Sequence, residues 1–437
     1  MRTPVQPGRA DVGHPPSGTP LTSCRVALDW LNFLLADAKG GLGPYLGIFL
    51  LTEPHWNQAT IGLVMTASGL IGLATRAPIG GFIDATRFKR SAIVAAAAVL
   101  GVSALAITLA PVFPVVLMAY AMIAEAGAVF GPAVAAITLG VLGRQGLAAW
   151  LGRNAAFDHA GNVFIACLAG ITGWWFGQQA VFYLVPIFAG FAAMAVLSIP
   201  AGAIDHARAR GLDGDRCERQ PAGWRALLEC QPLAIFAGCV ALFHFANAPM
   251  LHLVGQKLAL ANRGAETMHM SACIVAAQLV MVPMALLVGA KADAWGRRPI
   301  FLAAFLILPI RGLFYTLSDD RYWLIGVQLL DGVGAGIAGA LTPLVLADLM
   351  RGTGRYNLSQ GMVATMQGIG AALSNTVAGV IVVQAGYSAA FLMLAGVAVV
   401  ACVVFLVAMP ETATTPREWL RARPGCAWSR AIYGPRA

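Results

Sequence analysis

The sequence predicts an all-α membrane protein with twelve transmembrane helices in two pseudo-symmetric six-helix bundles. Three observations support this fold class. Of the 437 residues, 58% are apolar or aromatic and only 11% are charged; twelve apolar stretches are long enough to cross a bilayer; and the two halves share a repeated pattern. A soluble domain carries about 25% charged residues, so the composition excludes a soluble globular protein. The net charge of +9 does not indicate nucleic-acid binding, because the bases lie in short gaps between apolar stretches, as in membrane proteins.

Each apolar stretch approaches the ~20 residues that a helix needs to cross the hydrocarbon core. Runs of this length without alternation of polar and apolar residues are not typical of β-strands. The predicted helices cover residues 27–51, 58–78, 91–110, 114–142, 155–177, 180–200, 231–254, 268–290, 299–317, 322–349, 359–384 and 387–409. Residues 1–26 have no compact apolar core, so we expect no cleavable signal peptide there.

The longest polar gap divides the predicted helices six and six. The expected organisation is an N-terminal tail (1–26), an N-terminal bundle (27–202), a linker (203–228), a C-terminal bundle (229–409) and a C-terminal tail (410–437). Of the 29 Lys and Arg residues, 24 fall in the tails and loops on one side of this arrangement, and three fall in loops on the other. Because positive residues collect on the cytoplasmic side, both termini are expected in the cytoplasm.

Two loops carry the same residues at an offset of 209 positions. Gly80 and Asp84 follow the second predicted helix, and Gly289 and Asp293 follow the eighth. The further members of these loops are Lys89, Arg90, Gly296, Arg297 and Arg298. Three more pairs of residues downstream keep the same offset, which indicates an internal duplication.

With twelve predicted helices, a central linker and paired Gly-x-x-x-Asp-x-x-Gly-Arg-Arg loops, the chain resembles the major facilitator superfamily (MFS) of transporters. The second loop matches the family motif, whereas Arg87 stands in place of Gly in the first. The resemblance implies that Asp84 and Asp293 help to hold the cytoplasmic side shut when the outer side is open. The alternative is that both loops are only positive anchors that set the topology.

Two other motifs of this family are incomplete. In the fourth predicted helix, Ile123 stands where proton-coupled members often carry Arg, and the fifth lacks the Gly-Pro of the family's antiporters. The sequence therefore does not support drug/proton antiport by the family's usual residues.

Titratable residues lie inside the helices that would line the central cavity in this family. An ionisable side chain in hydrocarbon costs about 2.5–3.5 kcal/mol on insertion scales, so it usually faces a cavity or a partner. The candidates for a substrate and coupling cavity are Asp37, Lys39, Glu125, Asp158, His244, Asn247, Arg311 and Asp331.

Structural alternatives exist for these candidates. Asp37 and Lys39, which precede a Gly- and Pro-rich stretch that can open the first helix, could pair with another helix. His244 can equally serve helix packing, and Arg311 could be a structural partner for an acid. Two polar stripes could line the inner mouth of the cavity or pack helices together. These stripes are Asn154, Asp158 and Asn162, and Gln360, Gln367 and Ser374.

These observations favour a secondary transporter that moves a small organic solute by alternating access, with protonation of buried carboxylates as the coupling step. The core acids exceed the core bases by one, which favours a cationic or zwitterionic solute and export over import. The alternative is a non-transporting membrane sensor or assembly factor with a transporter-like fold. No gap between predicted helices exceeds about thirty residues, which leaves no room for the sizeable soluble domain expected of a sensor.

The sequence holds no nucleotide-binding loop, catalytic triad or metal-ligand spacing, so we expect no enzyme activity, catalytic residue, metal or cofactor. The expected partners are a small-molecule substrate, protons and the lipid bilayer, without nucleic acid. Because Arg, Ala and Gly are abundant, as in GC-rich bacterial genomes, we expect the protein in a bacterial inner (plasma) membrane. We also expect a multi-pass monomer.

Overall fold

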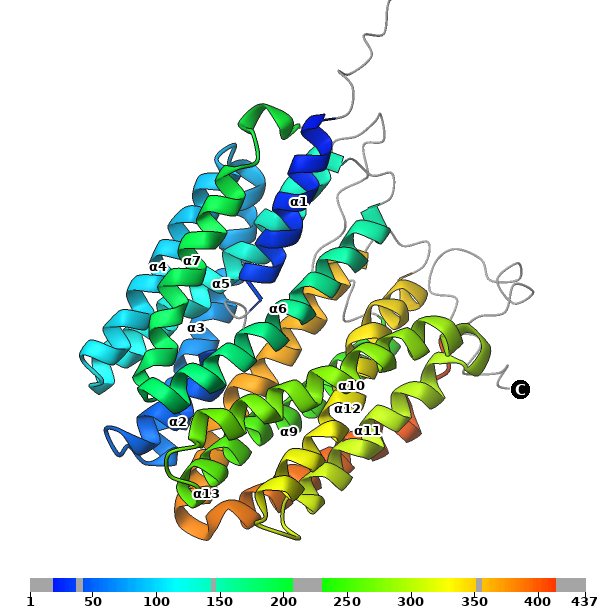
Figure 1. The fold of residues 1–437 in the computed structure, drawn as a ribbon. Coiled ribbons are helices and arrows are strands. Elements are labelled where there is room, and N and C mark those ends of the chain that lie inside the picture. Colours follow the sequence, from blue (N-terminus) through cyan, green and yellow to red (C-terminus); the bar gives the residue numbers. More distant parts are fainter. Residues whose placement is uncertain (1–18, 37–41, 143–146, 207–229, 351–355, 414–437) are drawn as a thin grey trace, which may run out of the picture.

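The computed structural model describes residues 19–36, 42–142, 147–206, 230–350 and 356–413. Regular secondary structure in these ranges is helical. Figure 1 shows the helices gathered in two bundles, α1 to α7 and α9 to α13. The predicted all-α fold with two six-helix bundles is therefore confirmed.

The N-terminal half contains α1 (Thr19–Leu34), α2 (Leu42–Thr52), α3 (Gln58–Ala85), α4 (Lys89–Leu109), α5 (Phe113–Leu142), α6 (Leu147–Phe176), α7 (Gln179–Leu197) and the short 3-10 helix η2 (Ala201–Ala203). The C-terminal half contains α9 (Gln231–Ala261), α10 (Glu266–Trp295), α11 (Arg297–Phe314), α12 (Arg321–Leu349) and α13 (Tyr356–Ala408). Nine helices in the described part of the chain are long and apolar enough to cross a membrane.

The twelve predicted spans account for these helices with three adjustments. The 53 residues of α13 supply two spans, because the helix is interrupted at Gly386, whose φ of 83° lies in the left-handed region that favours glycine. The first span is divided between α1 and α2, which are each too short to cross alone. α11 counts as a span although it carries three arginines.

Several helices extend beyond the predicted spans. α3 continues to Ala85 and α6 begins at Leu147, whereas the apolar stretches are shorter. Hydropathy marks only the part of a helix that lies in hydrocarbon. In α6, Arg153 and Asn154 separate the first turns of the helix from the apolar stretch that begins at residue 155.

Each half has an apolar core of its own. One cluster of buried side chains includes Phe49, Phe130 and Phe182 of the N-terminal half. The other includes Phe236 and Phe305 of the C-terminal half. Equivalent helices pack together in both halves: α3 on α5 and α10 on α12, and α4 on α7 and α11 on α13.

The two ends of the helices differ in charge. We call one the arginine-rich end; it includes Arg87, Arg90, Arg153, Arg297 and Arg298. The opposite end contains the loops at residues 53–57, 110–112, 262–265 and 315–320. The two bundles lie close together at the opposite end and diverge toward the arginine-rich end (Figure 1).

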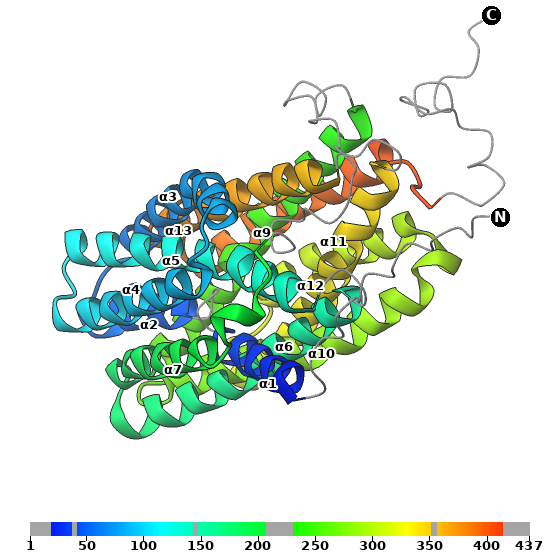
Figure 2. The same cartoon turned by 90° about the horizontal axis from the view of Figure 1, so that it is seen from above.

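Two pairs of helices join the halves. Seen from above, α3 lies beside α13 on one side of the molecule, and α6 lies beside α10 on the other (Figure 2). α2 also packs against α9. The contact between the halves is therefore made by α2, α3 and α6 of one half and by α9, α10 and α13 of the other.

Small residues allow α3 to approach α13 closely. A Cβ at Gly62 would overlap the backbone carbonyl oxygen of Asn375. One turn along, the Thr66 hydroxyl donates a hydrogen bond to the carbonyl oxygen of Ala372 (2.6 Å), and it lies 2.8 Å from the hydroxyl of Thr376. Small residues with hydroxyl hydrogen bonds are typical of tightly packed membrane helices.

Further hydrogen bonds between the halves involve Gln58 and Tyr387, Tyr45 and Ser271, and His159 and Gln278. Gln58 begins α3 at the opposite end, and His159 and Gln278 lie near the midpoints of α6 and α10. The hydrogen bonds between the halves in the described residues thus extend from the opposite end to the middle of the helices. In this conformation the halves are joined at the opposite end.

The close approach of α3 to α13 can be tested with Gly62→Ala. Because the new methyl group must push α13 away, we expect the free energy of unfolding to fall by about 1–3 kcal/mol, measured by thermal unfolding in detergent. Gly81→Ala is the matched control on the same helix, since no heavy atom lies within 4 Å of its Cβ position. It should be neutral or slightly stabilising, because Ala favours helix over Gly. Equal unfolding temperatures for the two variants would contradict the close packing.

Candidate functional site

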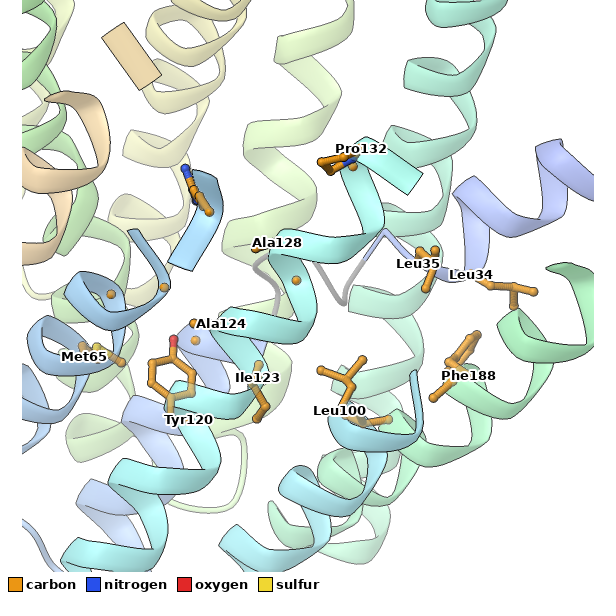
Figure 3. Close-up of a pocket in the computed structure, with 18 of the residues that line it drawn as sticks. Leu34, Leu35, Met65, Leu100, Tyr120, Ile123, Ala124, Ala128, Pro132 and Phe188 are labelled. Carbon is orange, nitrogen blue, oxygen red and sulfur yellow. The ribbon is translucent and has the colours of Figure 1, made fainter. Parts of the chain in front are cut away.

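A cavity of about 470 Å³ lies in the N-terminal half between α1, α2, α3, α4, α5 and α7. Figure 3 shows the apolar side chains of Leu100, Ile123 and Phe188 among those that line it. The polar groups among the described lining residues include the Tyr120 hydroxyl and the Arg76 guanidinium. This N-half cavity therefore presents a largely apolar wall with few hydrogen-bonding groups.

The N-half cavity reaches the boundary between the halves at Gly43. A Cβ at this position would lie 2.9 Å from the Tyr120 hydroxyl and 3.4 Å from Cε1 of His252. Tyr120 approaches from α5 and His252 from α9 of the other half. The Nδ1 atom of His252 is buried without a hydrogen-bond partner in the described part of the chain.

A second cavity, of about 310 Å³, lies in the C-terminal half between α9, α12 and α13. We call it the C-half cavity. His244 and Asn247 line it from α9, Thr342 from α12, and Gln360 and Gln367 from α13. Its wall is thus rich in side-chain amides, whereas that of the N-half cavity is not.

A buried ion pair lies next to the C-half cavity. Arg311 of α11 pairs with Asp331 of α12, and their side chains are 1% and 12% exposed. Nη1 of Arg311 also donates to Oδ1 of Asn247 (2.6 Å). Three of the predicted cavity residues are therefore in contact, and Asn247 both lines the cavity and binds the ion pair.

The hydrogen-bond network continues toward the opposite end. Nε of Arg311 donates to the Tyr315 hydroxyl (3.2 Å), and this hydroxyl donates to Oε1 of Gln328. Nη2 of Arg311 has no partner among the described residues. A buried guanidinium is stable only when it is paired and hydrogen-bonded, so this network holds α9, α11 and α12 in one arrangement.

Other predicted residues lie apart from this network. Glu125 on α5 is partly buried and makes no hydrogen bond or ion pair with another described residue. Asp158 on α6 is also partly buried. Asp37 and Lys39 lie outside the described residues.

Some residues of the two predicted polar stripes line a cavity, and others are buried. Gln360 and Gln367 line the C-half cavity, but Ser374 is fully buried and donates to the carbonyl oxygen of Ala371 (2.9 Å). Asn154 is buried, with Nδ2 3.5 Å from the Thr138 hydroxyl. Asn162 is partly buried on α6.

The family model described as Major Facilitator Superfamily matches residues 29–261 and 233–427. The chain belongs to the major facilitator superfamily. An uncharacterized MFS-type transporter of Mycobacterium tuberculosis is 50% identical over 400 residues, which cover 91% of this chain and 96% of that protein. The chain is therefore a multi-pass membrane transporter of the MFS.

Two solved MFS structures have a similar fold. The nucleoside transporter NupG gives a TM-score of 0.73 at 13% identity, covering 88% of this chain and 98% of that one. The xylose transporter XylE from E. coli, in a partially occluded inward open conformation, gives a TM-score of 0.67 at 12% identity, covering 91% and 100%. At this level of identity the similarity shows the fold alone.

The second MFS loop is held by contacts within the C-terminal half. The Asp293 side chain is 91% exposed and pairs with Arg297 one turn later (2.7 Å). Nε of Arg297 also donates to Asp348 at the end of α12 (3.1 Å). The arginine of this loop thus ties α11 to α12.

Gly296 and Glu411 join the start of α11 to the segment after α13. The φ of Gly296 is 85°, and a Cβ there would lie 2.6 Å from Oε2 of Glu411. The Glu411 carboxylate accepts hydrogen bonds from the backbone N–H groups of Arg297 (2.8 Å) and Arg298 (3.1 Å). It therefore caps the N-terminus of α11, where a negative charge is favourable.

The first MFS loop uses its bases differently. Lys89 is 1% exposed, and its Nζ donates to the carbonyl oxygens of Ile83 and Thr86 (2.8 Å each). Arg90 donates to the carbonyl oxygen of Leu197 (2.7 Å). Asp84 lies in the last turn of α3, and its side chain is outside the described set.

The motif glycines of the two loops also differ in what they contact. Gly80 and Gly289 have no heavy atom within 4 Å of a Cβ. In this conformation, packing does not require glycine at either position, in contrast to Gly296.

Sequence reasoning missed several residues of the site. Tyr120 and His252 are single polar residues in apolar helices, and their meeting at Gly43 depends on how the halves pack. Glu411 was assigned to the C-terminal tail, and no local pattern relates it to the N-terminus of α11, which lies 114 residues earlier in the chain.

The Arg311–Asp331 pair can be tested with a double-mutant cycle. Arg311→Met or Asp331→Leu alone leaves a buried charge without its partner, so each should lower the free energy of unfolding by about 3–5 kcal/mol. The double variant should lose clearly less than the sum, measured by chemical denaturation in detergent. Strictly additive losses would contradict a direct pair.

Proposed function

We propose that this MFS transporter is a proton-coupled secondary transporter that exports a small organic solute by alternating access. The observation that carries the proposal is the buried ion pair of Arg311 and Asp331, which contacts the wall of the C-half cavity through Asn247. A buried acid beside a cavity can exchange a proton and change the contacts of its neighbours as it does so.

The contacts between the halves support alternating access. The hydrogen bonds between them lie between the opposite end and the middle of the helices, whereas the bundles diverge toward the arginine-rich end (Figure 1). We place the arginine-rich end in the cytoplasm because of the positive-inside rule. A solute then enters this conformation from the cytoplasm, which is the first step of export.

Asp331 is the proposed proton site. Protonation removes the negative charge that balances Arg311, and an unbalanced guanidinium in a buried position is costly. The helices that carry the network must then adopt a packing in which Arg311 is again satisfied. Because α9 belongs to both the network and the contact with the other half, such repacking can reach the boundary between the halves.

Glu125 is the proposed solute contact in the N-terminal half. It has no partner among the described residues, and its neighbours Ile123, Ala124 and Gly127 line the N-half cavity. A carboxylate without a fixed partner is available to a solute that enters the space between the halves. In this proposal the two halves divide the work, with Glu125 on the solute and Asp331 on the proton.

We also propose the membrane, the orientation and the oligomeric state of the protein. Both tails and the linker face the cytoplasm of a bacterial cell, and the helices cross its inner membrane as a monomer. Residues 1–18, 207–229 and 414–437 lie outside the described part, so their place rests on the sequence alone.

The proposal predicts different defects for the two acids. Asp331→Asn fixes a neutral side chain, so proton-driven transport in proteoliposomes should fall at least tenfold while solute counterflow persists, because exchange requires no net proton movement. Glu125→Gln should weaken both activities. The assay uses a solute identified by thermal-shift screening of the purified protein against metabolites.

Asp319→Asn is the matched control, since Asp319 also pairs with a base, Lys257, but is 83% exposed at the opposite end. It should leave both activities within about twofold, as expected for a surface ion pair. Full proton-driven transport by Asp331→Asn would contradict the proposed proton site. Solute binding without flux in any assay would favour a sensor instead.

A further inference from the structure

The C-half cavity contains side-chain groups with unused hydrogen-bonding capacity. Gln360 and Gln367 make no hydrogen bond with another described residue, although both line the cavity. They lie two turns apart on the same face of α13. Two side-chain amides on one cavity wall, neither engaged in packing, are suited to a ligand that both donates and accepts hydrogen bonds.

The α9 side of the cavity offers one donor and one acceptor. Oδ1 of Asn247 accepts from Arg311 (2.6 Å), so its Nδ2 group is left as a donor. Nδ1 of His244 donates to the carbonyl oxygen of Val240 (2.9 Å). In the neutral ring Nε2 is then an acceptor.

The same wall lacks a group that would bind an ion. None of the described residues that line the C-half cavity is charged. The nearby guanidinium of Arg311 is balanced by Asp331. An ionic group that entered this cavity would lose its hydration without gaining a counter-charge, which costs several kcal/mol.

We propose that the C-half cavity is a specificity site for an uncharged hydrogen-bonding group of the solute, such as a polyol or a carboxamide. Gln360 and Gln367 bind it from α13, and Asn247 and His244 bind it from α9. This inference rests on the proposed transport function and adds the chemical class of the solute. The Arg311–Asp331 pair removes one acid and one base from the count of core charges, so the excess of one acid remains, and the preference for an uncharged group applies to the C-half cavity.

The C-half cavity is also linked to the proposed proton site at Asp331. A group that accepts a hydrogen bond from Nδ2 of Asn247 fixes the orientation of this amide. Oδ1 is then held toward Arg311, beside Asp331. Occupation of the cavity is thereby linked to the ion pair through one side chain.

The test uses the full-length protein in detergent and probes of similar size but different charge. Nicotinamide is uncharged, nicotinate is its anionic analogue and 1-methylnicotinamide its cationic analogue; myo-inositol represents uncharged polyols. We expect nicotinamide or myo-inositol to raise the unfolding temperature, with at least tenfold tighter binding than either charged analogue. Binding of nicotinamide would indicate recognition of a carboxamide, and binding of myo-inositol would indicate recognition of a polyol.

Variants then assign the binding to the cavity. Gln360→Leu and Gln367→Leu should each weaken binding at least tenfold, whereas Gln179→Leu, an exposed glutamine at the opposite end, should not change it. Gln367→Glu places a carboxylate in the wall and should reverse the preference toward 1-methylnicotinamide. This gain of binding cannot result from misfolding.

The proposal is overturned if neither uncharged probe binds, if a charged analogue binds more tightly to the wild type, or if the Leu variants bind normally. Binding in detergent requires no transport, so it remains informative if the proposed function fails. Bound probe without flux in proteoliposomes would contradict transport alone. Flux of a charged solute that is indifferent to both glutamines would contradict this site alone.

Discussion

The charge of Arg311 constrains the whole C-terminal half. The side chain is 1% exposed, so the protein must supply the interactions that water would otherwise provide. It does so with Asp331 of α12, Asn247 of α9 and Tyr315 at the end of its own helix. Breaking one of these contacts leaves a buried charge or dipole unsatisfied. The arrangement of α9, α11 and α12 is therefore linked to the protonation state of one carboxylate.

The contact between the halves has a different chemistry. α3 and α13 meet through glycine and threonine residues, and similarly small residues bring α6 to α10: a Cβ at Gly173 would overlap the side chain of Thr267. Such contacts depend on close fit and contain few strong bonds. A modest change in the angle between the bundles can break them together. A change in the Arg311–Asp331 pair can therefore change the angle between the bundles, because the contacts between the halves are easily broken.

The sequence correctly predicted features that depend on a single helix. Long apolar stretches located the spans, and the seven-residue spacing of Gln360 and Gln367 correctly placed them on one face. Ser374 continues that spacing, but a straight helix drifts by about 20° for each seven residues, and Ser374 is buried against its own helix. The Gly- and Pro-rich stretch after Asp37 predicted an opening of the first helix; α1 ends at Leu34 and α2 begins at Leu42, and residues 37–41 lie outside the described part of the chain.

Contacts between different helices could not be predicted from sequence patterns. Arg311 and Asp331 are twenty residues apart on different helices, and no local pattern indicates that they pair. Their pairing cancels one acid against one base and leaves amides as the polar groups that face the C-half cavity. The meeting of Tyr120 and His252 at Gly43 likewise depends on the angle between two bundles, which hydropathy does not encode.

The central claim is that the proton on Asp331 controls the angle between the halves. The most direct measurement is the distance between spin labels at Arg87→Cys and Ala294→Cys, which are exposed at the arginine-rich end of the two halves, by pulsed electron paramagnetic resonance from high to low pH. The account predicts that the wild-type distribution shifts with pH, and that Asp331→Asn shows the low-pH distribution throughout. A pH-dependent shift that persists in Asp331→Asn would contradict it.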